Sequence, residues 1–305
     1  MADRSEIAAI RLRDWVEGLS VGDAFGERFF INPDVVENMI EARGVPSPPW
    51  RFTDDTMMAL SVARILIHYG HIEQDGLAGS FAEHYDSSRG YGGSMHGVLR
   101  RIGNGEPWME VTRGQFGGQG SYGNGAAMRV APIGAFFAES LDSVVEQAER
   151  SAVVTHSHVE AIAGAIAVAV AAAHASRLRG SDNIPDCAEF LDLVLPLVPT
   201  SEVRSGIRKA REMGAGASVQ FAASVLGTGV RVSAQDTVPF ALWCAGRCLG
   251  DFEEAMWLTV SGLGDRDTTC AIAGGIVAAH LGVKEIPGDW LQAREALPNW
   301  AFVED

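Results

Sequence analysis

Two short acidic clusters stand out in the sequence because each combines two carboxylates with hydroxyl groups. The first is Thr53-Asp-Asp-Thr56, and the second, about 210 residues later, is Asp265-Arg-Asp-Thr268. A single Asp or Thr at a helix start caps free backbone N–H groups and favours the positive end of the helix dipole. Capping needs only one side chain, however, and paired carboxylates repel each other unless a cation lies between them. Because hard cations such as Mg²⁺ take oxygen ligands, the two clusters predict a shared site for one or two divalent ions.

The composition indicates a large buried core in an acidic protein. Of the 305 residues, 47% are hydrophobic and 21% are charged, and the formal net charge is −15. Charge of this sign argues against general binding to nucleic acids or anionic membranes, so neither partner is expected. The longest small-apolar run, Ala161–Ala173, is shorter than the ~20 residues of a membrane span. The charged start of the sequence has no signal-peptide core, and a cytoplasmic location is expected.

The cysteines do not form a metal-binding pattern. They are Cys187, Cys244, Cys248 and Cys270. Only Cys244 and Cys248 stand close together, and no further Cys or His pair follows them. Buried free thiols in a reducing compartment are therefore favoured over a zinc site.

Helical periodicity dominates the chain, and it must position the two clusters. Apolar residues recur at helical spacing over Ile7–Leu19, and the glycines of Gly18–Glu27 indicate either close helix packing or a tight turn. Further helices are expected over 56–69, 77–85, 94–102, 141–151, 159–177, 186–195, 202–213, 218–226, 238–249, 252–260, 267–281 and 289–296. Only Val230–Val232 reads as a strand. Since clusters near opposite ends of the chain must meet, we expect one all-α domain over 1–305, an orthogonal helical bundle with a binuclear metal cleft.

Two glycine-rich segments lie between the predicted helices. They are Ser88–Met95 and Arg113–Gly125. The first has no Walker lysine and no preceding strand, which excludes a P-loop on pattern. The second leads into a predicted helix start at Ala126, with Pro132 expected to bend that helix.

With these motifs in place, the chain resembles the ADP-ribosylglycohydrolase family, which removes ADP-ribose from modified proteins and small molecules. The resemblance covers about Gly18 to Trp290. Its motifs come in family order: Gly22-Asp-Ala-Phe-Gly, Thr53-Asp-Asp-Thr, Arg89-Gly-Tyr-Gly, Gly120-Ser-Tyr-Gly-Asn-Gly-Ala-Ala-Met-Arg-Val-Ala, Thr155-His-Ser-His and Leu263-Gly-Asp-Arg-Asp-Thr. It implies an all-α fold with two Mg²⁺ or Mn²⁺ ions at the base of a cleft.

The resemblance also implies the residues of the site. The implied metal ligands are Thr53, Asp54, Asp55, Asp265, Asp267 and Thr268. The implied substrate-binding residues are Gly90, Tyr91, Gly92, Ser94, Gly120, Ser121, Tyr122, Gly123, Asn124 and His156. Among these, Ser121 would face phosphate and Tyr122 would stack on adenine, unless Tyr122 only anchors its loop. His156 would contact the ligand, unless it is a capping or core residue.

The sequence departs from the family pattern at two positions. Arg266 stands where the common Gly-Asp-Thr-Asp-Thr motif has Thr, and Phe30 stands where the family usually has an acidic residue. Glu27 is the nearest acid to Phe30 and becomes the expected catalytic group, together with Asp54 and Asp55. Arg129 is expected to be a structural ion-pair partner.

The implied reaction is hydrolysis of the glycosidic bond of ADP-ribose through an oxocarbenium-like state. The Tyr-Gly loops look most like the branch that acts on serine-linked ADP-ribose, O-acetyl-ADP-ribose and poly(ADP-ribose). An arginine-directed hydrolase is the nearer alternative, and a crystallin-like or ADP-ribose-binding protein without turnover is another. A two-metal phosphohydrolase would typically have His or Lys in its ligand set, and neither cluster contains one.

Overall fold

The computed structural model describes residues 4–181 and 183–302, and over these residues the predicted all-α fold is confirmed. The α-helices are α1 (Arg4–Glu27), α2 (Pro33–Glu41), α3 (Asp54–Tyr69), α4 (Gln74–Glu83), α5 (Gly93–Gly103), α6 (Trp108–Arg113), α7 (Ala131–Phe136), α8 (Leu141–Val153), α9 (Val159–Arg177), α10 (Cys187–Val194), α11 (Glu202–Glu212), α12 (Val219–Leu226), α13 (Ala234–Arg247), α14 (Phe252–Val260), α15 (Arg266–Leu281) and α16 (Gly288–Ala293). Two isolated β-bridges, Trp50 with Arg294 and Gly123 with Ser233, are the β-structure of the described chain.

α1 and α15 pack against each other along a row of glycines. A Cβ on Gly22 would lie 2.2 Å from the Cys270 carbonyl oxygen, and one on Gly26 would lie 2.2 Å from that of Arg266. Gly18 approaches Ala278 in the same way. The glycines at i, i+4 and i+8 therefore form one face of α1, because these positions lie above one another on a helix. This close contact sets the end of α1 beside the start of α15, where the second acidic cluster lies.

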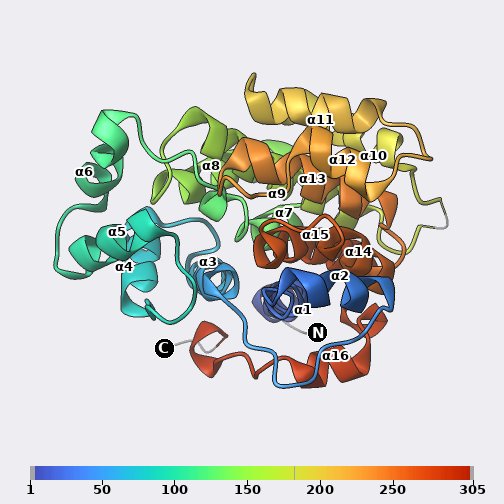
Figure 1. The fold of residues 1–305 in the computed structure, drawn as a ribbon. Coiled ribbons are helices and arrows are strands. Elements are labelled where there is room, and N and C mark those ends of the chain that lie inside the picture. The colour runs from blue at the N-terminus through green and yellow to red at the C-terminus, as the bar shows by residue number, and fades with distance from the viewer. Residues whose placement is uncertain (1–3, 182, 303–305) are drawn as a thin grey trace.

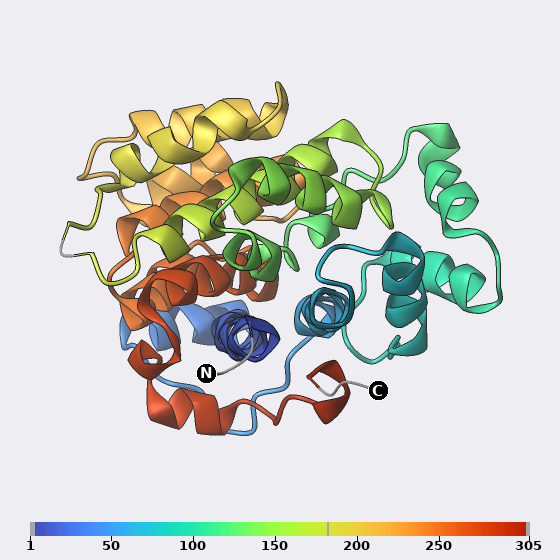
Figure 2. The same ribbon diagram turned by 180° about the vertical axis from the view of Figure 1, so that it is seen from behind.

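The remaining helices surround this pair. In Figure 1, α15 lies directly above α1 and α3 lies beside it, while α16 and the C-terminal segment pass underneath. α9, α11 and α13 form a layer beyond α15, and α4, α5 and α6 project to the other side of α3 in both views (Figures 1 and 2). α3 thus stands between the main helical body and the α4–α6 group.

Most helices lie where periodicity predicts them. α9 and α14 have the predicted bounds, but α1 continues through the glycines to Glu27, so these glycines serve close packing and not a turn. Val230–Val232 is a turn and not a strand. Pro132 lies at the start of α7, where its missing N–H costs no hydrogen bond, and bends no helix. All four cysteines are free, as expected.

One described helix, α9, is long and apolar enough to cross a membrane by composition. Within the fold, 78% of its most apolar window is buried. Its hydrophobic surface therefore packs against the surrounding helices and serves the core.

Candidate active site

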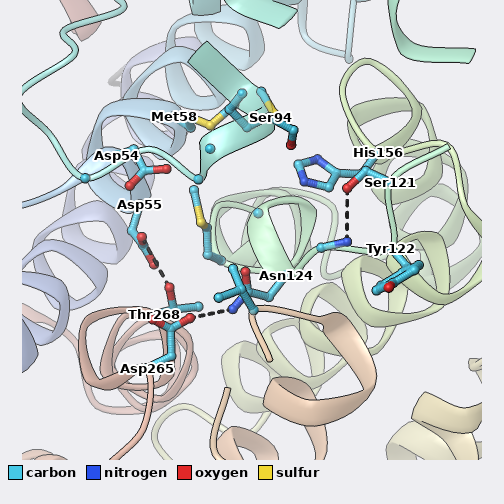
Figure 3. A pocket seen from close by; sticks show the side chains of 18 of the residues that line it. Asp54, Asp55, Met58, Ser94, Ser121, Tyr122, Asn124, His156, Asp265 and Thr268 are labelled. Atoms are coloured by element: carbon cyan, nitrogen blue, oxygen red, sulfur yellow. Dashed lines mark hydrogen bonds between the residues drawn. The ribbon is translucent and has the colours of Figure 1, made fainter. Parts of the chain in front are cut away.

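The predicted motifs come together around one cavity of about 510 Å³. α3, α5 and α15 each begin at this cavity, and the loop from Ser121 to Gly125 closes another side (Figure 3). Thirteen of the predicted site residues line it: Asp54, Asp55, Gly90, Gly92, Ser94, Ser121, Tyr122, Gly123, Asn124, His156, Asp265, Asp267 and Thr268. The volume lies in the range of ~300–1,000 Å³ that is usual for small-molecule sites.

Asp55 joins the two acidic clusters. Its Oδ2 accepts hydrogen bonds from the Thr53 hydroxyl at 3.1 Å and from the Thr268 hydroxyl at 3.4 Å. Asp265 Oδ2 in turn accepts from the Asn124 side-chain amide at 2.7 Å. The clusters that are far apart in sequence therefore meet in space, and the glycine-rich loop is tied to the second of them (Figure 3).

Asp23 holds the first cluster in place through hydrogen bonds, a role that we did not predict. This fully buried carboxylate of α1 accepts from the backbone N–H and the hydroxyl of Thr53 and from those of Thr56, at 2.5–3.1 Å. Burial still outweighs these hydrogen bonds and raises the pKa of Asp23 to about 6. The signal in the sequence that could have indicated this role was an acidic residue among the glycines of α1.

A second network ties the first cluster to the neighbouring glycine-rich segment. The Asp54 N–H donates to the Arg89 carbonyl at 2.8 Å, and the Arg89 guanidinium donates to the Phe52 carbonyl and to Glu295. The guanidinium also lies 4.4 Å from the centre of the Phe52 ring. Glu295 Oε1 also accepts from the Phe52 N–H at 3.0 Å, so a residue near α16 helps to place Asp54.

The clustered carboxylates carry more negative charge than their surroundings offset. Burial and, next, the charge of Asp23 raise the pKa of Asp54 to about 8 and that of Asp55 well above its usual range. Burial and then the charge of Asp265 do the same for Asp267. Such shifts mark a functional site when they arise in a cavity from specific neighbours.

The donor set fits a hard divalent cation. Asp55 Oδ1 and Asp267 Oδ1 are buried and have no hydrogen-bond partner, which leaves two anionic oxygens unmatched. Carboxylate and hydroxyl oxygens are the ligands that Mg²⁺ and Mn²⁺ prefer. Within residues 4–181 and 183–302, no three His, Cys, Asp or Glu side chains already converge as a closed metal cage. Mutually repelling carboxylates would have to draw together around an ion.

The rest of the cavity lining offers hydrogen-bond donors. The first turn of α5 begins at Gly93 without a side-chain cap, and its residues line the cavity. Ser121 Oγ accepts from the Gly123 N–H at 3.2 Å, which leaves the Ser121 proton free to donate. Free N–H groups at a helix start and neutral hydroxyl donors suit phosphate oxygens.

Comparison with known proteins decides the family. The sequence profile of the ADP-ribosylglycohydrolase family matches residues 5–304. The chain belongs to the ADP-ribosylglycohydrolase family. The human ADP-ribosylhydrolase ARH3 is 29% identical, over 93% of this chain and 89% of its own length. A protein of Archaeoglobus fulgidus without an assigned function is 34% identical, over 97% and 94%.

Two further matches agree with this placement. The ADP-ribosylarginine hydrolase Tri1 of Pseudomonas putida is 28% identical, over 94% of this chain and 75% of its own. A solved structure described as an ADP-ribosylglycohydrolase-related protein complex superposes with a TM-score of 0.64 at 26% identity, covering 97% of this chain and 96% of that one. Together the matches support ADP-ribosyl hydrolase activity.

Four residues implied by the ADP-ribosylglycohydrolase resemblance do not line the cavity. Thr53 caps α3 and bonds Asp23, and the Tyr91 ring is buried against Tyr85 at 5.0 Å. Gly120 packs against Ser157 and His158 and has a φ of +75°. Glu27 is half-buried in the last turn of α1, and not in a turn after it. The Tyr91 side chain therefore packs against its neighbours and does not point into the cavity.

The two departures from the ADP-ribosylglycohydrolase pattern contact each other. The Arg266 guanidinium lies 4.5 Å from the centre of the Phe30 ring and donates to the Phe29 carbonyl at 2.6 Å. Arg266 Nε also donates to the Gly264 carbonyl. Arg266 therefore points to the loop after α1, which it ties to the start of α15.

Other residues that line the cavity were not predicted. Phe116 and Val232 are both more than half exposed and have positive φ angles. The Phe116 ring stacks on Tyr122, with ring centres 6.4 Å apart. For Phe116, an aromatic residue among glycines was a signal in the sequence. Val232 reaches the cavity through a turn, which its apolar, β-branched neighbours did not indicate.

Proposed function

We propose that this family member is a metal-dependent hydrolase that removes ADP-ribose from serine-linked ADP-ribose, O-acetyl-ADP-ribose or poly(ADP-ribose). The observation that carries this proposal is that one cavity is lined both by an acidic cluster and by a set of neutral donors. The acidic side of the lining includes Asp54, Asp55 and Asp267, and the donor side includes Ser121 and the start of α5. A ligand that links a pyrophosphate to a ribose matches this combination.

On the donor side, the chain would bind the adenosine diphosphate part. N–H groups of the first turn of α5 and the Ser121 hydroxyl would donate to phosphate oxygens. Tyr122 is 48% exposed and stands at the rim with Phe116, where a purine ring can stack. These contacts would hold the ligand so that its far ribose reaches the acids.

On the acidic side, Asp54, Asp55, Asp265, Asp267 and the hydroxyls of Thr53 and Thr268 would hold two Mg²⁺ or Mn²⁺ ions. Bound ions supply a Lewis acid that orients the ribose hydroxyls and makes a water molecule more acidic. Asp23 would keep Thr53 and the start of α3 in place through its four hydrogen bonds.

A proton acceptor would complete the chemistry. Glu27 is the first candidate, because burial and then the charge of nearby Asp23 raise the pKa of its carboxyl. Asp54 and Asp55 are the alternatives within the cavity. The cleavage passes through positive charge at the ribose carbon, which neighbouring carboxylates stabilise.

The acceptor preference is supported by the resemblance of the loops around Tyr91 and Tyr122 to the serine-directed branch. An arginine acceptor is the second candidate, because a relative at 28% identity is described as an ADP-ribosylarginine hydrolase. The two candidates differ only in the group that leaves from the ribose carbon.

Turnover assays with Mg²⁺, with Mn²⁺ and with a chelator would test the proposal. Serine-linked, arginine-linked and O-acetyl substrates are compared by the release of free ADP-ribose. We expect release to require metal and to be fastest with the serine or O-acetyl ester linkage. An arginine substrate preferred by tenfold or more, about 1.4 kcal/mol in the barrier, would reverse the acceptor assignment. Binding of ADP-ribose without release from any substrate would make the protein a reader and not an enzyme.

A further inference from the structure

A fully buried positive charge, Arg129, lies behind the loop that lines one part of the cavity. Arg129 is 0% exposed, and within the described part of the chain it forms no ion pair, contrary to our expectation. It donates instead to the carbonyls of Gly125 and Ser151 and to the Thr155 hydroxyl, and its guanidinium lies 4.6 Å from the Phe81 ring centre. Burying a guanidinium costs several kcal/mol, which its hydrogen bonds and the charge of Asp54 offset only in part, so we expect a role beyond packing.

One of the hydrogen bonds from Arg129 leads on to His156. Arg129 Nη1 donates to Thr155 Oγ1 at 2.9 Å, and Thr155 Oγ1 lies 2.7 Å from His156 Nδ1. A guanidinium can only donate, so the Thr155 oxygen accepts from it. Among the described residues, His156 Nδ1 is the one acceptor within hydrogen-bond distance of the Thr155 hydroxyl, so the Thr155 proton goes to Nδ1. In a neutral ring this arrangement places the ring proton on Nε2.

The Nε2 atom lies beside the glycine-rich loop of the cavity. His156 lines the cavity, and its Nε2 is 3.1 Å from the position that a Cβ on Gly123 would occupy. Ser121 Oγ is 3.2 Å from the same position. Figure 3 shows the His156 ring and the Ser121 side chain side by side on this wall. The absence of a side chain on Gly123 therefore leaves one space that both donors border.

We infer that Arg129 is a positioning residue that acts through Thr155 to hold His156 as the Nε2–H tautomer, so that the ring offers a fixed donor to an oxygen atom of the ligand. The identity of that ligand, ADP-ribose, rests on the proposed function, whereas the tautomer does not. The buried guanidinium also disfavours a second positive charge on the ring: burial and then Arg129 lower the pKa of His156 to about 3. The donor is thus neutral throughout the physiological range.

Nitrogen NMR of the ¹⁵N-histidine-labelled protein tests the tautomer directly. The chain has eight histidines, and the His156 signals are assigned by their loss in His156→Gln. We expect the parent and Thr155→Ser to show Nε2–H alone, whereas Thr155→Val, which keeps the shape but loses the hydroxyl, shows mixed tautomers. Thr112→Val is the matched control, because Thr112 is equally buried but donates to the Val154 carbonyl.

Calorimetric titration with ADP-ribose in the presence of Mg²⁺ tests the consequence for binding. We expect Thr155→Val to weaken binding about tenfold, or about 1.4 kcal/mol, and Thr155→Ser and Thr112→Val to change it less than threefold. Arg129→Lys keeps a donor-only group and should keep the tautomer, whereas Arg129→Met should not. If Arg129→Met fails to fold, the comparison of Thr155→Val with Thr155→Ser still tests the inference.

Either of two results would overturn the inference: an Nδ1–H signal in the parent, or equal ADP-ribose affinity in Thr155→Val and Thr112→Val. Failure of the parent to bind ADP-ribose would instead remove the proposed function. The NMR comparison would then still show whether Arg129 and Thr155 fix the tautomer.

Discussion

At the scale of single residues, the site is defined by charges and donors that the fold leaves unmatched. Asp267 illustrates this, because its Oδ1 is buried without a partner and its pKa is raised by burial and by Asp265. A protein that maximised its own stability would pair or remove such a carboxylate. Keeping it is consistent with a bound cation.

Asp267→Asn should therefore separate stability from activity. In the metal-free protein, loss of one repelling charge should raise Tm by about 2 °C, the scale of roughly 1 kcal/mol in a chain of this size. The increase in Tm on adding Mg²⁺, and the release of ADP-ribose, should both largely disappear. Differential scanning calorimetry with and without chelator measures this. Asp192→Asn, which changes an exposed ion pair with Arg211, is the control, and a variant that keeps its metal-induced shift would contradict the two-cluster site.

Gly123→Ala should block the ligand without disturbing the fold. Gly123 has φ −58° and ψ 161°, which alanine adopts freely, but the new methyl would lie between His156 and Ser121. We expect ADP-ribose affinity to fall tenfold or more while Tm changes by less than about 2 °C. Gly97→Ala, where a Cβ meets nothing within 4 Å, is the control. Unchanged affinity in Gly123→Ala would mean that the ligand does not use this wall.

Glu27→Gln keeps the size and polarity of the side chain but removes its charge. If Glu27 accepts the proton, turnover should fall by roughly 10²-fold or more, the scale for losing a general base, and ADP-ribose affinity should change much less. Steady-state kinetics together with calorimetric titration distinguishes the two effects. Parent-like turnover would assign the proton acceptor to Asp54 or Asp55 and leave Glu27 as a partly exposed residue of α1.

At the scale of elements, the contact between α1 and α15 positions the acids. Asp23 and the second cluster come close only because the glycines of α1 let the two backbones approach. Arg266 adds a tether at one end of this contact through Phe29 and Phe30. The geometry of the site therefore depends on the glycines of α1 as much as on the acidic side chains.

Gly22→Ala should damage both stability and metal binding. The added methyl would lie 2.2 Å from the Cys270 carbonyl oxygen, so the helices must separate. Overpacking of this kind costs about 1–3 kcal/mol, and the displaced Asp23 should weaken the response of Tm to Mg²⁺. Gly79→Ala in α4, with nothing within 4 Å of the new Cβ, should be neutral or stabilising. Denaturant unfolding of both variants gives the comparison, and equal stability would exclude close packing as the function of Gly22.

At the scale of the whole molecule, the sequence predicted the helices better than their contacts. α9 and α14 were predicted to the residue because their apolar periodicity has clear limits. The acidic clusters and most cavity residues were also predicted, the latter from resemblance. Asp23 and Glu295 were missed, because their hydrogen bonds join positions remote in sequence. The burial of the Tyr91 ring could not be predicted, because a glycine-rich setting does not reveal which way a ring points.

The acidic cluster should also give the metal-free protein an unusual pH dependence. Carboxyls whose folded pKa is raised, such as Asp54 at about 8, bind more protons when folded, so their contribution to stability is lost as pH rises toward 8. His156, with a lowered pKa of about 3, opposes this trend only below about pH 6.5. With chelator present, Tm should therefore fall between about pH 6.5 and 8.5, and Mg²⁺ should flatten the curve. A rise in Tm over that range without metal would contradict the assigned shifts.

The contact between α1 and α15 also constrains how the chain folds as it is synthesised. α1 is synthesised long before the helix that covers its glycine face, which begins only at Arg266. Until then Asp23 has its partners in the Thr53 cluster but lacks the helix that brings the second cluster beside it. An N-terminal fragment ending before Arg266 would therefore expose the α1 face and leave the proposed cation site incomplete. We expect the cavity to assemble only late in translation, after α15 has been synthesised.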